Sequence, residues 1–257
     1  MKDILCAFLT KQSARKVPEI ILLFWIIKLL TTSMGEATSD YLVHTFDPVI
    51  VVIIGFIGFL ITISLQFYVK KYFAWVYWLA VTMVAIFGTM AADVVHIVLG
   101  VPYLYSTIFF AISLTIIFAL WYKIEHTLSI HSIFTPRREL FYWLTVVTTF
   151  ALGTAAGDMT AVTLNLGYLN SGILFGILFF LPLVIFKLTN KTEAFYFWFA
   201  YVMTRPFGAS FADFFGRTSD LGGIGFGTGK VSIILTILII LAVAYLTKTK
   251  KDIKNKS

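Results

Sequence analysis

Cysteine and charge are both scarce in this 257-residue chain. The single cysteine, Cys6, has no partner, which excludes an intrachain disulfide framework. Only 13% of the residues are charged and 59% are hydrophobic, whereas about a quarter of the residues in a soluble globular domain are charged. The mean hydropathy of +0.91 indicates a protein whose partner is the lipid bilayer.

Signatures of catalysis and of nucleotide binding are missing as well. The sequence contains no HExxH motif and no Ser-His-Asp order, and the glycine-rich stretch 217–230 lacks the Walker spacing. We therefore expect no enzyme and no cofactor, and we interpret this stretch as a lid over the external mouth. Residues 1–17 lack the apolar region and cleavage site of a secretory signal, so we expect the first helix to be a retained anchor.

What the chain does have is eight apolar runs of about 20 residues, each long enough to cross a hydrocarbon core of roughly 30 Å. Pro18, Pro48 and Pro102 stand where three of them begin, a position at which proline favours a helix start. The predicted helices cover residues 18–43, 49–69, 73–99, 102–122, 139–164, 169–187, 194–215 and 231–247.

The basic residues gather on one side of this topology. Most lie in the N-terminal tail, in three links between helices and in the C-terminal tail, whereas the opposite connections hold only Arg217 and Lys230. The positive-inside rule then predicts a multi-pass protein of the inner (cytoplasmic) membrane with both termini in the cytoplasm. This placement explains the pI near 9.4 without a nucleic-acid partner, and the sequence indicates no particular oligomeric state.

Four segments of the chain align without a gap and share an aromatic-Trp-x9-Gly-x3-small-Asp pattern. The tryptophans are Trp25, Trp78, Trp143 and Trp198, the glycines are Gly35, Gly88, Gly153 and Gly208, and the aspartates are Asp40, Asp93, Asp158 and Asp213. Each copy lies in the first helix of a two-helix unit, so the four units have the same orientation.

The repeat predicts an all-α fold with eight transmembrane helices in a ring of approximate fourfold symmetry, the motif helices forming the inner layer. We expect one transmembrane domain over residues 1–257, with units at about 16–70, 71–123, 137–190 and 191–247 and basic tails at 1–15 and 248–257. The pattern resembles bacterial membrane proteins with four tandem copies of a repeat of unknown function, each with two transmembrane segments and a characteristic tryptophan. The resemblance covers about residues 16–247 and implies the fold, but no activity.

Each repeated residue has a structural and a functional interpretation. Glycine followed four residues later by a small residue is the surface that lets membrane helices approach closely, so we assign the four glycines to helix packing. The tryptophans are either interface anchors or inner packing, and their fixed spacing favours packing.

The aspartates are harder to explain by structure alone, because a carboxylate at membrane depth costs on the order of 2.5–3.5 kcal/mol on insertion scales. Each aspartate could hydrogen-bond across a repeat interface, and symmetry would reproduce that bond four times. Alternatively the four form a common cation or proton site. The spacing from Trp to Asp places them in the outer third of the membrane.

Three charged residues of the aligned segments, Lys28, Glu36 and Arg205, occur in single copies. Lys28, Glu36 and Asp40 share one helix face with Thr32, and the fourth unit carries Arg205 followed by Pro206. Lys28 and Arg205 either neutralise Glu36 and one aspartate or couple cation binding to a gate. His96 and His44 follow Asp93 and Asp40 by one turn, a spacing that permits metal ligation, although a lone histidine is more often structural.

These residues lead to two hypotheses. The first is a transporter of a small inorganic cation, either a divalent metal or one coupled to protons, which uses the four aspartates and Glu36; its single-copy charges favour a carrier. The second is a structural or partner-binding subunit in which the aspartates only hold helices together. Carboxylate and hydroxyl oxygens suit magnesium, manganese or protons better than soft metals.

Overall fold

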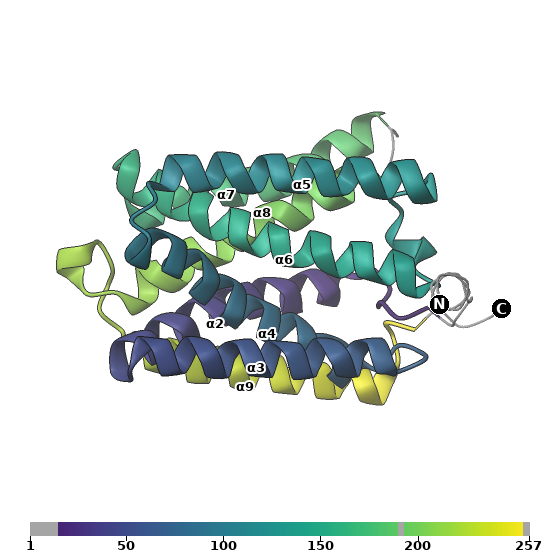
Figure 1. Cartoon of the computed structure of the whole chain (residues 1–257), viewed down its shortest axis with the longest axis horizontal. Coiled ribbons are helices and arrows are strands. Elements are labelled where there is room, and N and C mark those ends of the chain that lie inside the picture. The colour runs from purple at the N-terminus through teal and green to yellow at the C-terminus, as the bar shows by residue number, and fades with distance from the viewer. Residues whose placement is uncertain (1–14, 190–192, 254–257) are drawn as a thin grey trace.

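The computed structural model describes residues 15–189 and 193–253, and its long helices run side by side along one axis (Figure 1). Within this part of the chain there is no strand. The basic N-terminal tail up to residue 14, with Cys6, lies outside the described residues. The long helices are α2 (Leu22–Thr45), α3 (Pro48–Tyr68), α4 (Ala74–Asp93), α5 (Tyr103–Glu125), α6 (Pro136–Asp158), α7 (Gly167–Thr189), α8 (Glu193–Gly216) and α9 (Thr228–Thr249). Four short segments are the π-helices η1 (Val94–Val98) and η3 (Met159–Thr163) and the 3-10 helices η2 (Ile130–Ser132) and η4 (Ser219–Leu221).

All eight predicted helices are present, and the prolines mark two of the three predicted starts. Pro48 is the first residue of α3, and Pro102 is the N-cap of α5. The prediction for Pro18 was wrong, because α2 begins only at Leu22. The preceding segment is irregular and ends in an extended Ile21, and the backbone N–H of Glu19 donates to the carbonyl of Asp252, 2.9 Å away, in the C-terminal segment.

The motif helices form the inner layer, as the repeat predicts. Helix α2 packs on α4, α4 on α6, α6 on α8, and α8 again on α2, which closes a ring. Within their most apolar stretches, α4 and α6 bury 50% and 61% of their residues, whereas α3, α5 and α9 bury 17% each. The inner helices are therefore shielded by an outer layer of α3, α5, α7 and α9.

Each outer helix packs mainly on the inner helix of the following unit. Helix α3 covers α4, α5 covers α6 and α7 covers α8, while α9 from the end of the chain covers α2 from its beginning. The fourth unit is thus joined to the first in the same way as any other consecutive pair. The arrangement is circular although the chain is open.

The four repeat glycines lie at the points where inner helices meet. Each one faces the residue that follows the next unit's tryptophan by seven positions. A Cβ added at the glycine would lie 2.5 to 3.1 Å from the Cβ of that residue, which is closer than real Cβ atoms ordinarily approach. The pairs are Gly35 with Ala85, Gly88 with Phe150, Gly153 with Arg205 and Gly208 with Thr32. This recurring contact supports the predicted packing role of the glycines and gives the ring its approximate fourfold symmetry.

Six of the long helices, α3 to α7 and α9, are long and apolar enough to cross a membrane. Many large apolar side chains of the outer helices point away from the protein, among them Ile54 at 63% exposure and Ile177 at 62%. An apolar surface of this extent is typical of contact with lipid. The chain is therefore a multi-pass membrane protein, and the two inner helices outside this set of six, α2 and α8, carry the buried side chains of Lys28, Glu36 and Arg205.

Both termini of the described chain lie at one end of the bundle, which we call the terminal end, and the loop between α8 and α9 lies at the opposite, distal end (Figure 1). At the terminal end Lys16 donates to Glu139, with Nζ and Oε2 2.6 Å apart, and Gln66 donates to the other oxygen of that carboxylate at 3.0 Å. Glu139 is fully buried. Each oxygen of this buried carboxylate therefore has a hydrogen-bond donor.

The glycine contacts predict a stability difference between two positions on α6. We expect Gly153→Ala to destabilise the protein by roughly 1–3 kcal/mol, because its methyl group would overlap Arg205 and Pro206. Gly157→Ala is the matched control, since its methyl group would lie 3.7 Å from Pro206 in ordinary contact. Thermal unfolding in detergent, followed by loss of the monodisperse chromatographic peak, measures both. Equal losses at the two positions would contradict the close-packing role of Gly153.

Candidate functional site

Buried side chains form successive layers along the inner ring, one helical turn apart. Each layer contains one residue from each repeat, at the same distance in sequence from the repeat tryptophan. The residues 3 positions after the tryptophans are Lys28, Val81, Val146 and Tyr201, and those 7 positions after are Thr32, Ala85, Phe150 and Arg205. The residues 11 positions after are Glu36, Thr89, Thr154 and Ala209, and those 15 positions after are Asp40, Asp93, Asp158 and Asp213. No side chain of the first three layers is more than 5% exposed. Lys28, Glu36 and Arg205 therefore lie inside the protein; in the fourth layer Asp40 and Asp213 are buried, whereas Asp93 and Asp158 are partly buried.

Arg205 on α8 reaches all three of the other inner helices. Its Nη2 donates to Glu36 Oε2 of α2 at 2.5 Å and to Thr154 Oγ1 of α6 at 2.8 Å, and it also donates to the Thr89 hydroxyl of α4. Its Nη1 donates to the backbone carbonyl of Thr32 at 3.2 Å. The three side-chain partners are equivalent positions of three repeats. The guanidinium thus occupies the middle of the ring, where a second copy would not fit.

Lys28 lies deeper in the ring and does not pair with a carboxylate. Its ammonium is 4.0 Å from the ring centroid of Phe150 and 4.1 Å from that of Tyr201. Among the described residues Nζ has no hydrogen-bond partner, and the side chain is 1% exposed. Two cation–π contacts are the stabilisation that the structure provides for it. Of the two basic residues predicted to neutralise Glu36, the structure brings only Arg205 to it.

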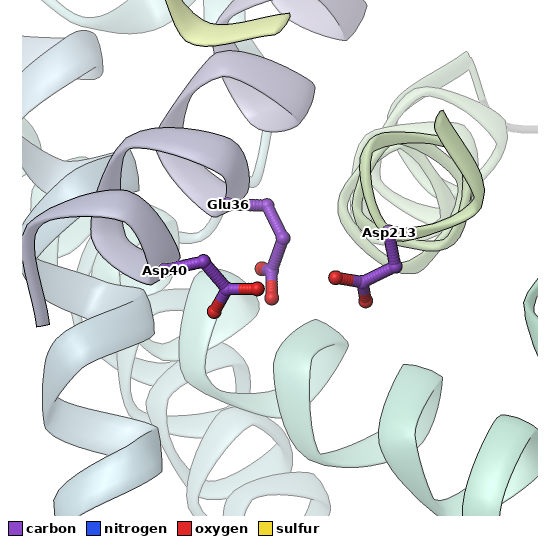
Figure 2. A group of neighbouring side chains, drawn as sticks. All are labelled: Glu36, Asp40 and Asp213. Carbon is purple, nitrogen blue, oxygen red and sulfur yellow. The ribbon is translucent and has the colours of Figure 1, made fainter. Parts of the chain in front are cut away.

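Three carboxylates gather on the distal side of Arg205. Glu36, Asp40 and Asp213 each offer an oxygen within 4.8 Å of the other two, and all three residues are buried. Figure 2 shows Glu36 and Asp40 side by side on α2, with the carboxylate of Asp213 approaching from α8. We call these three residues the acidic cluster. Oxygen donors at such distances suit a hard cation or a shared proton.

Arg217, the first residue after α8, joins two members of this cluster. Its Nη2 lies 2.9 Å from Asp40 Oδ2, and its Nε donates to Asp213 Oδ1 at 2.7 Å. Burial lowers the pKa of Arg217, but the Asp213 and Asp40 charges outweigh burial and raise that pKa above its ordinary value, which keeps the guanidinium charged. The sequence pattern placed Arg217 at the start of the external glycine-rich stretch interpreted as a lid, without a partner. Its i, i+4 spacing from Asp213 was the signal that could have identified it.

Asp93 and Asp158, from α4 and α6, complete the aspartate layer without an ion pair. Both interact electrostatically with Glu36 and Asp40, so they face the same interior. Within the described chain neither carboxylate has a hydrogen bond or a basic partner in contact. Each is the last residue of its α-helix and is followed by a five-residue π-helix, η1 or η3. Single π-helical turns occur frequently at functional sites.

The two histidines predicted as metal ligands have other partners. The Nδ1 of His44 lies 2.7 Å from the backbone carbonyl of Asp40, and that of His96 lies 2.9 Å from the carbonyl of Val101. The Nε2 of His96 lies 3.3 Å from the Ser106 hydroxyl. In the described chain, the group of residues placed to share a metal ion contains neither histidine.

The repeat tryptophans pack into an aromatic cluster on the terminal side of Lys28. Trp78, Trp143 and Trp198 are between 1% and 4% exposed, and Trp25 is partly exposed and contacts Phe179 and Phe197. The indole N–H of Trp198 donates to the carbonyl of Leu128 at 2.9 Å. This burial favours inner packing over interface anchoring for three of the four.

These features define the class of the protein. It is a multi-pass helical membrane protein of four tandem two-helix units, with charged side chains inside the ring of first helices. The chain belongs to the family described as Repeat of Unknown Function (DUF347), whose model matches residues 23–72, 76–127, 141–192 and 196–252. The repeat tryptophan is the third residue of every matched segment. The chain matches no curated protein and no solved structure.

The two buried basic residues predict losses of stability that differ in size. We expect Arg205→Met to destabilise the protein by about 3–5 kcal/mol, because it leaves the Glu36 carboxylate buried without its partner. Adding Glu36→Gln should restore much of the loss, since the stranded charge is then removed. Lys28→Met is the control and should cost far less, because no acceptor is stranded. Thermal unfolding in detergent tests all three variants; a Lys28→Met loss as large as that of Arg205→Met would refute the assignment.

Proposed function

We propose that this protein is a membrane carrier for a small inorganic cation, with the acidic cluster and the other two aspartates of the layer as its binding groups. The observation that supports this proposal most directly is the convergence of Glu36, Asp40 and Asp213 within 4.8 Å in the interior of the bundle. Cation transport would explain why carboxylates, which are energetically costly to bury in a membrane protein, lie at this site.

The balance of charge also favours a cation. Five carboxylates face this region, and the basic groups that contact them are Arg205 and Arg217, which pair with Glu36, Asp40 and Asp213. The aspartates also lie near the C-terminal ends of their helices, where the aligned peptide dipoles add negative potential. Carboxylate oxygens are hard ligands, so we infer magnesium, manganese or a proton as the cargo.

The packing of the interior favours a carrier over an open pore. On the terminal side of the acidic cluster the ring is filled by Arg205, Phe150, Lys28 and Tyr201, none more than 1% exposed. A cation held at the cluster has no open path toward the terminal end through these layers. Release to that side therefore requires the inner helices to move, which is the behaviour of a carrier.

We infer that α2 and α8 cross the membrane together with the six apolar helices, which gives eight spans. Each has 24 residues, a length of about 36 Å at the rise of an α-helix. Their charges are inside the ring, where polar residues of membrane helices normally lie. The excess of Lys and Arg in the terminal-end links and tails supports placing both termini in the cytoplasm, and hence the protein in the inner membrane.

A structural or partner-binding role without enzymatic activity is the second candidate. The ion pairs from Arg205 to Glu36 and from Arg217 to Asp40 join α8 to α2, the helices of the last and first units. Salt bridges at this junction would hold the ring closed without any cargo. This role predicts that Asp93 and Asp158, which lack such pairs, contribute nothing.

Substitution of the two unpaired aspartates therefore distinguishes a cation carrier from a structural subunit. We expect Asp93→Asn and Asp158→Asn to abolish cation flux while the protein remains folded, because neither substitution breaks an ion pair. Purified protein in liposomes, assayed with a manganese-quenched dye, a magnesium dye and a pH dye, provides the measurement.

Asp47→Asn is the matched control for this experiment. Asp47 is exposed at the distal end, where its carboxylate caps α3 by accepting from the N–H groups of Val49 and Ile50. Asparagine caps helices equally well, so flux should be unchanged. Full flux in both interior variants would exclude the cation proposal, and loss of folding in them would favour the structural role.

The proposed sidedness has its own test. In a Cys6→Ser background, a cysteine in place of Asp220 in the α8–α9 loop should react with a membrane-impermeant thiol reagent added outside whole cells. A cysteine in place of Thr127 in the α5–α6 link should react only after the membrane is opened. The reverse pattern would place the termini outside.

A further inference from the structure

Arg217 occupies a position that has no counterpart in the other repeats. The residues at the same distance from the other three tryptophans are His44, Ile97 and Val162. The side chain of Arg217 is 23% exposed, whereas those of Asp40 and Asp213 are 10% and 3% exposed. The guanidinium therefore stands between the acidic cluster and the surface at the distal end.

The loop that follows holds the backbone of Arg217 in place. It folds back on the end of α8, where the N–H of Gly225 donates to the carbonyl of Arg217 and the N–H of Ile224 to that of Phe214, both at 2.8 Å. Gly222, Gly225 and Gly227 adopt positive φ, a conformation that glycine permits. The loop thus positions Arg217 with its side chain directed at α2 and α8.

We propose that Arg217 is a latch that closes the distal end of the ring, so that an external cation reaches the acidic cluster only after the guanidinium leaves Asp40 and Asp213. This inference rests on the proposed function, because it assumes that cations enter from the distal side. The guanidinium and an arriving cation compete for the same carboxylate oxygens. A cation that binds therefore favours the open latch, and departure of the cation lets Arg217 close again.

Access to a buried cysteine tests the latch without any transport measurement. In the Cys6→Ser background, Ser210→Cys places a thiol on α8 one turn before Asp213, at a site that is 2% exposed. We expect a cationic, membrane-impermeant thiosulfonate added from outside to label it slowly. Adding Arg217→Gln should accelerate labelling at least about tenfold, the change that ~1.4 kcal/mol of lost closure produces.

Lys230→Gln is the control for charge. Lys230 is exposed at the start of α9, at the same end of the bundle, and has no ion pair within the described chain. Its substitution removes the same positive charge from the approach path of the reagent and should leave the labelling rate unchanged. Unchanged labelling in Arg217→Gln, or an equal increase in Lys230→Gln, would overturn the latch.

A second pair of variants guards against a failure of folding. Ser39→Cys on α2, at a fully buried position next to Asp40, replaces the Ser210 probe if that variant is unstable. Asp40→Asn with Asp213→Asn releases Arg217 from its partners and should accelerate labelling with the arginine still present. Latch-dependent labelling in a protein without cation flux would reject only the proposed function. Flux that depends on Asp93, with labelling independent of Arg217, would reject only the latch.

Discussion

The close approach of neighbouring inner helices at the repeat glycines is the constraint on which the rest of the protein depends. In a membrane, helices gain little from the hydrophobic effect by associating, so contact between their surfaces supplies much of the attraction. Gly35, Gly88, Gly153 and Gly208 each accept a residue of the next unit where a side chain would block it. Four such contacts bring the helices close enough that Glu36 of α2 and Asp213 of α8 share one small volume.

The glycine contacts also determine where the buried guanidinium of Arg205 lies. Gly153 admits the stem of Arg205, whose guanidinium then neutralises Glu36, and Gly208 faces Thr32, whose carbonyl accepts from the same guanidinium. The position on the ring axis also explains why Arg205 occurs once. A group that touches equivalent residues of three units fills the axis, so symmetry-related copies are excluded by space, and the repeat must be broken there.

The repeat predicted much of the architecture because its four copies align without a gap and so identify equivalent positions on four helices. Helix number, the inner position of the motif helices and the role of the glycines follow from it, and most helix boundaries agree within a few residues. The late start of α2 after Pro18 was not predicted; the segment before this helix contacts Asp252 near the other end of the chain, a neighbour that the local sequence does not reveal. Nor did the sequence reveal that Lys28 lies between Phe150 and Tyr201, because a helix face specifies direction but not the neighbours from other units.

The aspartate layer is chemically divided although its sequence pattern is uniform. On α2 and α8 the carboxylates are held by Arg217, a permanent charge delivered by a folded loop. On α4 and α6 each aspartate is instead the last residue of its α-helix, and a π-helix, η1 or η3, follows it. In the carrier that we propose, the two kinds of group would have different roles: the carboxylates paired with Arg217 would define the closed state, and the unpaired carboxylates would bind the cargo. A cation would therefore meet the least competition from basic side chains of the protein at Asp93 and Asp158.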